Sequence, residues 1–174
     1  MVKVIYIAGS TRSGSTLLGS ILGQVEGVFF ASEVYRIWHP RDRTAGLCSC
    51  GKKEEECEVW SAIFKDAFGD INKVDIERMR YMRDRYILTR RLPFVIIKQY
   101  HEKIVREICE YLEITKVLYE SIHEITKCSA IVDSSKSPLY AYLLSKVIYC
   151  SFNKRRSSCC ILLDSSQIFA KYTR

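Results

Sequence analysis

The sequence predicts an α/β fold, in which helices flank a parallel sheet. Short apolar runs rich in β-branched residues, at 3–8, 28–31 and 130–132, alternate with longer segments whose apolar residues have helical spacing. Strands that alternate with helices form parallel sheets, because each helical crossover returns the chain to the same end of the sheet. Ligands of such sheets bind beyond the carboxyl ends of the strands, so we expect the loops after the three runs to converge on one site.

The helical segments are recognised by the spacing of their apolar residues. The predicted helices cover 17–25, 74–91, 104–125 and a last segment that begins after Pro138. Pro93 is expected to close the helix over 74–91. From Tyr35 to about Phe68 the periodicity lapses among glycines and a proline, so we expect an irregular, cysteine-containing insertion at 35–68.

The charge of the chain divides it into a body and a tail. Its 174 residues are 48% hydrophobic, which suits one globular domain, and its net charge is +7. From Lys146 onward there are six basic residues and one acidic residue, which account for +5 of that charge. We therefore expect a domain over 1–146 and a divergent basic tail over 147–174. The other basic cluster, at 78–91, is interrupted by Asp84 and indicates a solvated helix face, so no nucleic-acid partner is expected.

No segment of the sequence has the length of a membrane span. A spanning helix needs about 20 consecutive apolar residues, and no stretch approaches that length. The first apolar run ends at Gly9 and is shorter than the apolar region of a secretory signal. We expect a cytoplasmic protein with no membrane span.

Three of the eight cysteines, Cys48, Cys50 and Cys57, are clustered in the predicted insertion. A zinc site would need a fourth ligand, and the nearest histidine, His39, has a spacing that matches no standard zinc finger. We therefore expect no metal. Two alternatives stay open: a local disulfide of Cys57 with Cys48 or Cys50, or three plain thiols that stabilise the insertion.

The loop after the first strand has the spacing of a phosphate-binding P-loop. It reads Gly9-Ser10-Thr11-Arg12-Ser13-Gly14-Ser15-Thr16, and Ser15 stands where the motif G-x-x-x-x-G-K-[ST] has its lysine. Glycines allow backbone N–H groups to point at an anion, the helix N-terminus adds partial positive charge, and the Arg12 guanidinium adds a full one. Without the lysine, we expect an anion with less charge than a magnesium triphosphate, and a phosphosulfate meets that description.

This loop resembles the 5′-phosphosulfate-binding loop of sulfotransferases that use 3′-phosphoadenylyl sulfate (PAPS), especially the branch with tyrosylprotein and carbohydrate enzymes. Residues 32–38 resemble the segment that carries the catalytic glutamate of the family. The pattern 48–51 with Cys57 and Trp60 is similar to one in bacterial-type members. Residues 132–138 resemble the segment whose lysine faces the transferring sulfuryl group.

The resemblance spans 3–145 and implies a P-loop-like sulfotransferase that moves a sulfuryl group from PAPS to an acceptor hydroxyl without a metal. It implies that residues 10–16 hold the 5′-phosphosulfate together with Ser135, and that Arg12 is the charge partner. Glu33 would be the general base for the acceptor hydroxyl. Lys136 would stabilise the negative charge that develops during transfer.

Simpler interpretations of two of these residues stay open. Glu33 also fits a surface carboxylate at a helix start, because one glutamate after a strand is common. Lys136 also fits a solvated lysine that precedes a helix capped by Ser137.

The end of the sequence departs from the family. Full members continue into another strand and an Arg-Asp-x-Arg segment that binds the 3′-phosphate, and here Arg155 and Arg156 precede the next apolar run, 160–163, instead of following it. We therefore expect a fold that is incomplete on its C-terminal side, with an uncovered sheet edge that favours self-association. A frame-shifted end of a longer gene would explain the tail, and the other reading frames beyond the Lys146 codon test that hypothesis.

Two other functions stay open because of this departure. One is a noncatalytic anion-binding protein, and the other is a P-loop nucleotide enzyme such as a small kinase. The sequence does not identify the acceptor.

Overall fold

A three-stranded parallel sheet lies at the centre of the fold. The structure, a computed structural model, describes residues 2–10, 12–38, 50, 52, 56–95 and 98–150. The strands are β1 (Val4–Ala8), β2 (Val28–Phe30) and β3 (Ala130–Lys136), in the order β1-β3-β2, so the last strand of the described chain is the central one. The predicted α/β class is confirmed. Thr11 and the tail from 151 onward lie outside the described residues.

The register of the sheet brings all three carboxyl ends to one edge, as predicted. β3 pairs with β1 from Val4↔Ile131 to Ala8↔Lys136, with an irregularity between Tyr6 and Ala8, and β2 ends opposite the middle of β3. β3 is longer than the predicted 130–132. It continues through the polar residues 133–135 to Lys136, because these residues are buried beside β1 and most of their polar groups find partners inside the protein.

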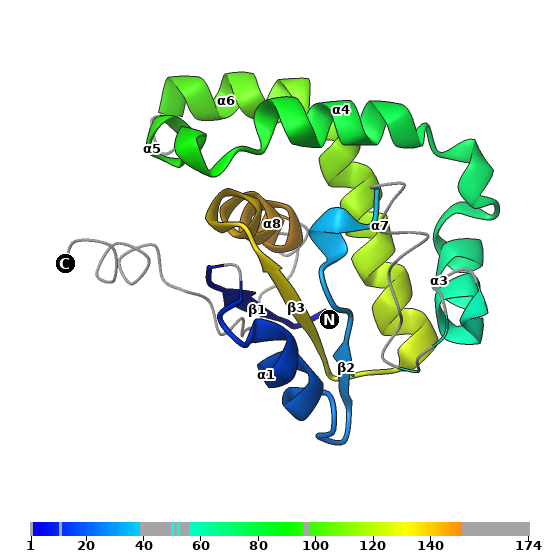
Figure 1. Ribbon diagram of the computed structural model, residues 1–174. Helices are drawn as coiled ribbons and strands as arrows, with labels where there is room; N and C mark the ends of the chain where they lie inside the picture. The colour runs from blue at the N-terminus through cyan, green and yellow to red at the C-terminus, as the bar shows by residue number, and fades with distance from the viewer. Residues whose placement is uncertain are drawn as a thin grey trace.

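The helices that follow β1 and β3 pack on this sheet (Figure 1). α8 (Pro138–Cys150) begins as predicted, and its first turn is capped by the Ser137 hydroxyl, which accepts from the Tyr140 N–H at 3.3 Å. α1 (Ser15–Leu22) approaches β2 at Gly19, where an added Cβ would lie 2.2 Å from the Phe30 ring. Three large apolar side chains of α1, those of Leu17, Leu18 and Ile21, are exposed.

A helical region of about a hundred residues connects β2 to β3. Its elements are η1 (Val34–Arg36), α3 (Glu58–Phe68), η3 (Ile71–Lys73), α4 (Ile76–Tyr86), η4 (Thr89–Arg91), α5 (Leu92–Val95), α6 (Lys98–Glu107) and α7 (Cys109–Thr126). In Figure 1, α3 lies beside α7, and α4, α5 and α6 lie across the end of the molecule beyond α8 and η1.

Three expectations for this region are wrong in detail. The predicted insertion is not irregular throughout, because α3 forms at its end and buries Trp60. The predicted helix over 104–125 is two helices, separated at Ile108, whose backbone departs from helical angles (φ −119°, ψ 17°). Pro93 does not close a helix but lies in the first turn of α5, where a missing N–H breaks no helical hydrogen bond.

One continuous apolar core joins the sheet to the helical region. It contains buried side chains from β3, α3, α4, α6, α7 and α8, and the Phe29 ring of β2 packs 6.2 Å from the Trp60 ring of α3. Cys128 is buried, whereas Cys109 is exposed. Within the described part of the chain, no helix is long and apolar enough to cross a membrane.

Candidate functional site

Two residues from distant parts of the chain meet at the carboxyl edge of the sheet. The Lys136 ammonium, at the end of β3, donates to Glu33 Oε1 at 2.5 Å, and the two side chains are 20% and 21% exposed. Arg36 Nη1 lies 3.4 Å from the other oxygen, Glu33 Oε2. Two of the three predicted catalytic residues, Glu33 and Lys136, are therefore in direct contact in a partly buried position.

A residue with a rare backbone conformation lies in the loop after β1, in the segment after β2 and at the last position of β3. Arg12 (φ 63°), Ser32 (φ 61°) and Lys136 (φ 65°) are three of the four non-glycine residues with positive φ in the described chain. Such a conformation costs a residue with a side chain about 1–2 kcal/mol. Backbone strain of this kind gathers at functional sites, where the surrounding structure holds it in place. The conformation of Ser32 was not predicted, because a serine carries no sequence signal for positive φ.

The loop between β1 and α1 leaves hydrogen-bond donors available to an anion. Gly14, at the N-terminal cap of α1, has φ 76°, no side chain caps the helix, and its first turn contains no acidic residue. The Ser15 hydroxyl is buried and has no hydrogen-bond partner among the described residues. The tight turn also favours a glycine at position 9, because a Cβ there would lie 2.8 Å from Ser13 Oγ. The first N–H groups of α1 and the Ser15 hydroxyl thus form a donor set without an acceptor.

The register of the sheet places this loop beside the Lys136–Glu33 pair. Ala8, the last residue of β1, is the neighbour of Lys136 across the sheet, and the loop begins at the next residue. Of the predicted anion-binding residues, the structure describes Ser10, Arg12, Ser13, Gly14, Ser15 and Thr16 on this edge, with Arg12 exposed. Thr11 lies outside the described residues.

A buried carboxylate supports the end of β3. Asp133 is fully buried and accepts hydrogen bonds from the Ser135 N–H at 2.8 Å, from the Ser135 hydroxyl and from the Tyr119 hydroxyl of α7. The Ser135 hydroxyl in turn accepts from the Tyr35 N–H at 2.9 Å. Ser135, predicted to bind the co-substrate, therefore has its hydroxyl engaged inside the protein, where it ties β3 to η1.

Burial is the main cause of the raised pKa values of Asp133 and Tyr119 in this network. Loss of solvent raises the pKa of Asp133 to about 6, although the hydrogen bonds from Ser135 and Tyr119 favour the carboxylate. The pKa of Tyr119 lies well above its usual value, first because of burial and then because of the charge on Asp133. Tyr119 therefore remains a hydrogen-bond donor. Sequence analysis missed Asp133, although an aspartate that directly follows an apolar strand is the signal that would have identified it.

A buried arginine holds η1 against α4. The Arg83 guanidinium lies 5.3 Å from the centre of the Tyr35 ring and is 2.8 Å from Asp84 Oδ1. The Tyr35 hydroxyl donates to the Ile87 carbonyl at 3.2 Å. These contacts fix the short segment that carries Glu33, so α4 positions the predicted base without touching it.

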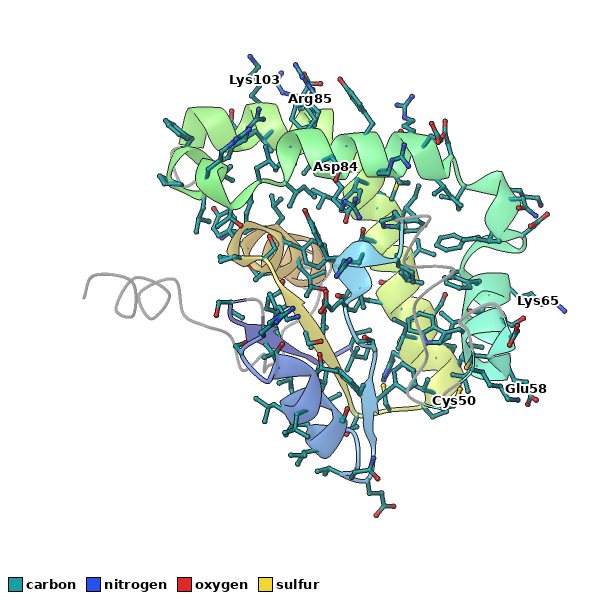
Figure 2. All side chains as sticks on the ribbon, viewed as in Figure 1. Cys50, Glu58, Lys65, Asp84, Arg85 and Lys103 are labelled. Atoms are coloured by element: carbon teal, nitrogen blue, oxygen red, sulfur yellow. The ribbon has the colours of Figure 1, made fainter. Side chains whose placement is uncertain are left out.

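Cys50 lies apart from this site, next to α3 (Figure 2). Cys50 Sγ is 3.6 Å from Cys57 Sγ, which is too long for a disulfide bond, and Cys57 is buried at the start of α3. No group of three potential metal ligands occurs in the described ranges. Cys48 and His39 lie outside them.

No protein-family model, curated protein or solved structure matches this chain. The residues and geometry above are therefore the basis of any functional assignment.

Proposed function

We propose that this chain is a sulfotransferase-like domain that transfers a sulfuryl group from PAPS to an acceptor hydroxyl. The observation that carries the proposal is the Lys136–Glu33 pair, which lies at the same sheet edge as a loop with unpaired hydrogen-bond donors. A base and a cation next to an anion site are the groups that such a transfer requires.

The residues of the loop fit the 5′ end of this co-substrate. The Ser15 hydroxyl and the uncapped first turn of α1 lack acceptors, and Arg12 can offer two N–H groups to one anion. These residues would hold the 5′-phosphosulfate. The bound co-substrate supplies the sulfuryl group, which is transferred to the acceptor oxygen. The described residues contain no identified counterpart for a 3′-phosphate site.

Glu33 and Lys136 then have separate tasks. The Glu33 carboxylate accepts the proton of the acceptor hydroxyl, and the Lys136 ammonium stabilises negative charge on the transferring group. The Lys136 ammonium donates a hydrogen bond to Glu33 Oε1. An anion in the loop competes with Glu33 for the ammonium, so its arrival frees the carboxylate to act as a base.

The finer fold assignment and the domain bounds belong to the same proposal. A P-loop-like domain over 1–146 is supported by the sequence of β1, a loop with left-handed Gly14, and α1, at the edge of a parallel sheet. The cytoplasmic location, the acceptor hydroxyl and self-association also remain proposals. The last is supported by Leu17 and Ile21 of α1, which are 67% and 58% exposed.

Thermal unfolding of the full chain with added ligands tests the binding half of the proposal. A ligand that binds only the folded state stabilises it by about 2.7 kcal/mol at a concentration of about 100 times its Kd. We expect PAPS and adenosine 3′,5′-bisphosphate to raise the Tm and Mg-ATP to leave it unchanged. Arg12→Ala should abolish the shift, and Lys116→Ala, which removes an exposed lysine of α7, should retain it.

Variants of the pair test the catalytic half. Glu33→Gln should bind adenosine bisphosphate and lose sulfuryl transfer, whereas Lys136→Met should weaken PAPS binding and lose transfer. A shift with Mg-ATP alone would replace the proposal with a nucleoside-triphosphate enzyme.

A noncatalytic anion-binding protein is the second candidate. The engagement of the Ser135 hydroxyl by Asp133 and Tyr35 favours it, because one predicted donor to the co-substrate is unavailable. Ligand-induced stabilisation without turnover of any acceptor hydroxyl would support this second function.

A further inference from the structure

A cavity of about 680 Å³ lies on the opposite side of α4 from the candidate site. It is enclosed by the end of α4, by η4, by α5 and by α6, and none of Arg12, Glu33 or Lys136 lines it. Arg83 of α4 faces Tyr35 and η1, whereas Arg85, two positions later and therefore about 200° around the helix, lines this cavity. We call it the cationic pocket.

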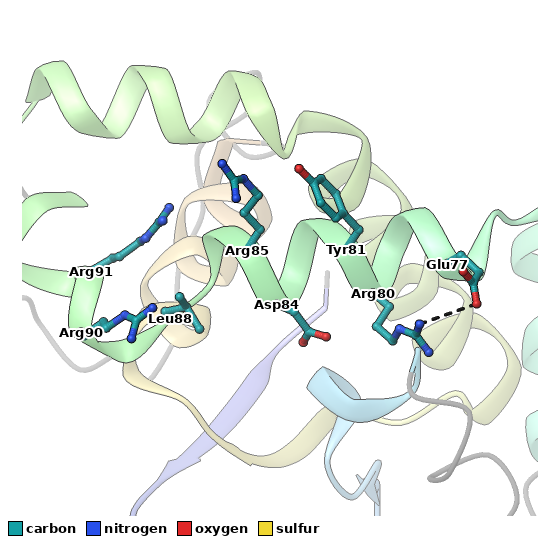
Figure 3. A pocket seen from close by; sticks show the side chains of 8 residues that line it. All are labelled: Glu77, Arg80, Tyr81, Asp84, Arg85, Leu88, Arg90 and Arg91. Carbon is teal, nitrogen blue, oxygen red and sulfur yellow. Dashed lines mark ion pairs between the residues drawn. The ribbon is translucent and has the colours of Figure 1, made fainter.

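Four cations surround the cationic pocket: Arg85, Arg90, Arg91 and Lys103. None of them forms an ion pair with any carboxylate in the described part of the chain. Figure 2 shows Lys103 of α6 and Arg85 of α4 close together at the surface. Figure 3 shows a neighbouring pocket, which shares Arg85, Arg90 and Arg91 with the cationic pocket. The pocket therefore has an excess of positive charge, because its four cations face the single carboxylate of Glu107.

The neighbouring acids leave that excess in place, because two of them pair with other arginines. Asp84 pairs with Arg83 at 2.8 Å, and Glu77 pairs with Arg80 at 3.6 Å. Glu107, the single acid in the wall of the pocket, accepts a hydrogen bond from the Tyr86 hydroxyl at 3.3 Å.

Two of the arginines are held in place by an aromatic ring. The guanidinium groups of Arg85 and Arg91 lie 5.9 and 5.8 Å from the centre of the Tyr86 ring. Stacking on an aromatic ring leaves the N–H groups at the rim of a guanidinium free to bind an anion. It also lowers the conformational entropy that binding would otherwise cost.

The remaining lining is apolar. Ile104 is buried, Phe94 is 53% exposed, and both line the pocket together with Tyr86. A pocket of a few hundred Å³ with an apolar wall and a few charged groups has the size and composition of a small-molecule site. A hydrated inorganic ion would make no favourable contact with the apolar wall.

We propose that the cationic pocket binds a small amphiphilic anion, in which one sulfonate, sulfate, phosphate or carboxylate head is attached to an apolar or aromatic body. The head contacts Arg85, Arg91 and Lys103, and the body packs on Phe94 and Ile104. Arg85, Arg90 and Arg91 also line the neighbouring pocket, but the cationic pocket combines them with the apolar Phe94 and Ile104, so a small amphiphilic ligand suits it better than a nucleic acid does. This site is separate from the proposed sulfuryl-transfer site.

Calorimetric titration of the full chain with three matched probes tests the proposal. Naphthalene-2-sulfonate carries both the head and the body, naphthalene-2-sulfonamide carries the same body without charge, and inorganic sulfate carries the charge without the body. We expect binding of the sulfonate, with each of the other two at least about tenfold weaker. Equal binding of the sulfonamide or of sulfate would overturn the proposal.

Variants test whether the sulfonate binds in the cationic pocket or on another surface. Arg91→Gln and Arg85→Gln should each weaken the sulfonate by about tenfold, because each removes a charged hydrogen-bond donor. Arg106→Gln, on the same helix as Lys103 but outside the pocket, should leave the affinity unchanged. Unchanged affinity in the double variant Arg85→Gln/Arg91→Gln, with a normal circular dichroism spectrum, would place the ligand elsewhere.

Vesicles distinguish a free ligand from a membrane surface. If the chain sediments with phosphatidylcholine vesicles that contain phosphatidylserine but does not bind the free sulfonate, the cations serve a membrane and the proposal is wrong. None of these measurements depends on sulfuryl transfer, so their result stands whether or not the proposed activity is found.

Discussion

At the scale of single residues, the Ser15 hydroxyl in the loop between β1 and α1 destabilises the fold but is available to bind an anion. It is buried and without a partner among the described residues, a situation that costs about 1–3 kcal/mol. Ser15→Ala should therefore raise the free energy of unfolding by about 1 kcal/mol and weaken the binding of adenosine bisphosphate. Urea unfolding and ligand titration measure the two effects, and Ser20→Ala in the same helix is the control. A destabilised variant would show that the hydroxyl has a partner.

The buried carboxylate Asp133 gives a second prediction at this scale. Its pKa is raised to about 6, so between about pH 4 and pH 6 the folded chain binds more protons at this position than the unfolded chain does. The contribution of Asp133 to stability is therefore greatest at low pH and falls as the pH rises through that range. The total loss is on the order of 3 kcal/mol.

Asp133→Asn removes this dependence, because an amide does not titrate. The difference in unfolding free energy between the wild type and Asp133→Asn, measured in urea at about six pH values, should fall as pH rises from about 4 to about 6 and then level off. A difference that does not change with pH would mean that Asp133 titrates normally in the folded chain.

The sequence predicts the chemistry of individual residues better than their backbone conformation. Glu33 and Lys136 were identified by a resemblance, and the structure brings them into contact. Parallel strands explain why such distant residues meet, since their carboxyl ends share one edge. The positive φ of Ser32 and Lys136 was not predictable, because neither serine nor lysine is a residue type that favours this conformation.

At the scale of elements, the end of α7 is strained and can be improved. Lys127 terminates this helix in the left-handed conformation, with φ 52° and ψ 22°, where glycine is the favoured residue. Lys127→Gly should stabilise the chain by about 0.5–1 kcal/mol, since relief of strain outweighs the loss of an exposed ion pair with Glu124.

Lys116→Gly, in the middle of the same helix, is the matched control. It should destabilise the chain by about 1 kcal/mol, because glycine weakens a helix interior. Thermal unfolding of both variants measures the contrast, and the same sign of change for both would contradict the left-handed conformation of Lys127.

Element boundaries were the least predictable part of the fold. Apolar spacing located α4 and α8, but it could not separate α6 from α7, because the apolar pattern continues across Ile108 while the backbone does not. The length of β3 was missed for a related reason. The polar second half of β3 has the composition of a loop. It forms a strand because it is buried between β1 and η1.

At the scale of the whole molecule, the sheet and the helical region share one apolar core. The hydrogen bond from Tyr119 of α7 to Asp133 of β3, the contact of Phe29 with Trp60, and a shared apolar core link the two parts. If these contacts make unfolding two-state, neither part is stable without the other. Both tryptophans of the chain, Trp38 and Trp60, are buried and report on the helical region and its contact with the sheet.

Unfolding in urea should therefore give one transition for every probe. Tryptophan fluorescence and far-ultraviolet circular dichroism, recorded on the same samples, should have coincident midpoints and slopes. Ile63→Ala, which opens a cavity in α3, should shift both midpoints together to lower urea by an amount equal to about 2–5 kcal/mol. If fluorescence alone shifted, α3 and α7 would unfold separately from the sheet. The helical region would then not fix the position of Glu33 and Lys136 through the core, and their contact would depend on the local bonds of η1 and β3 alone.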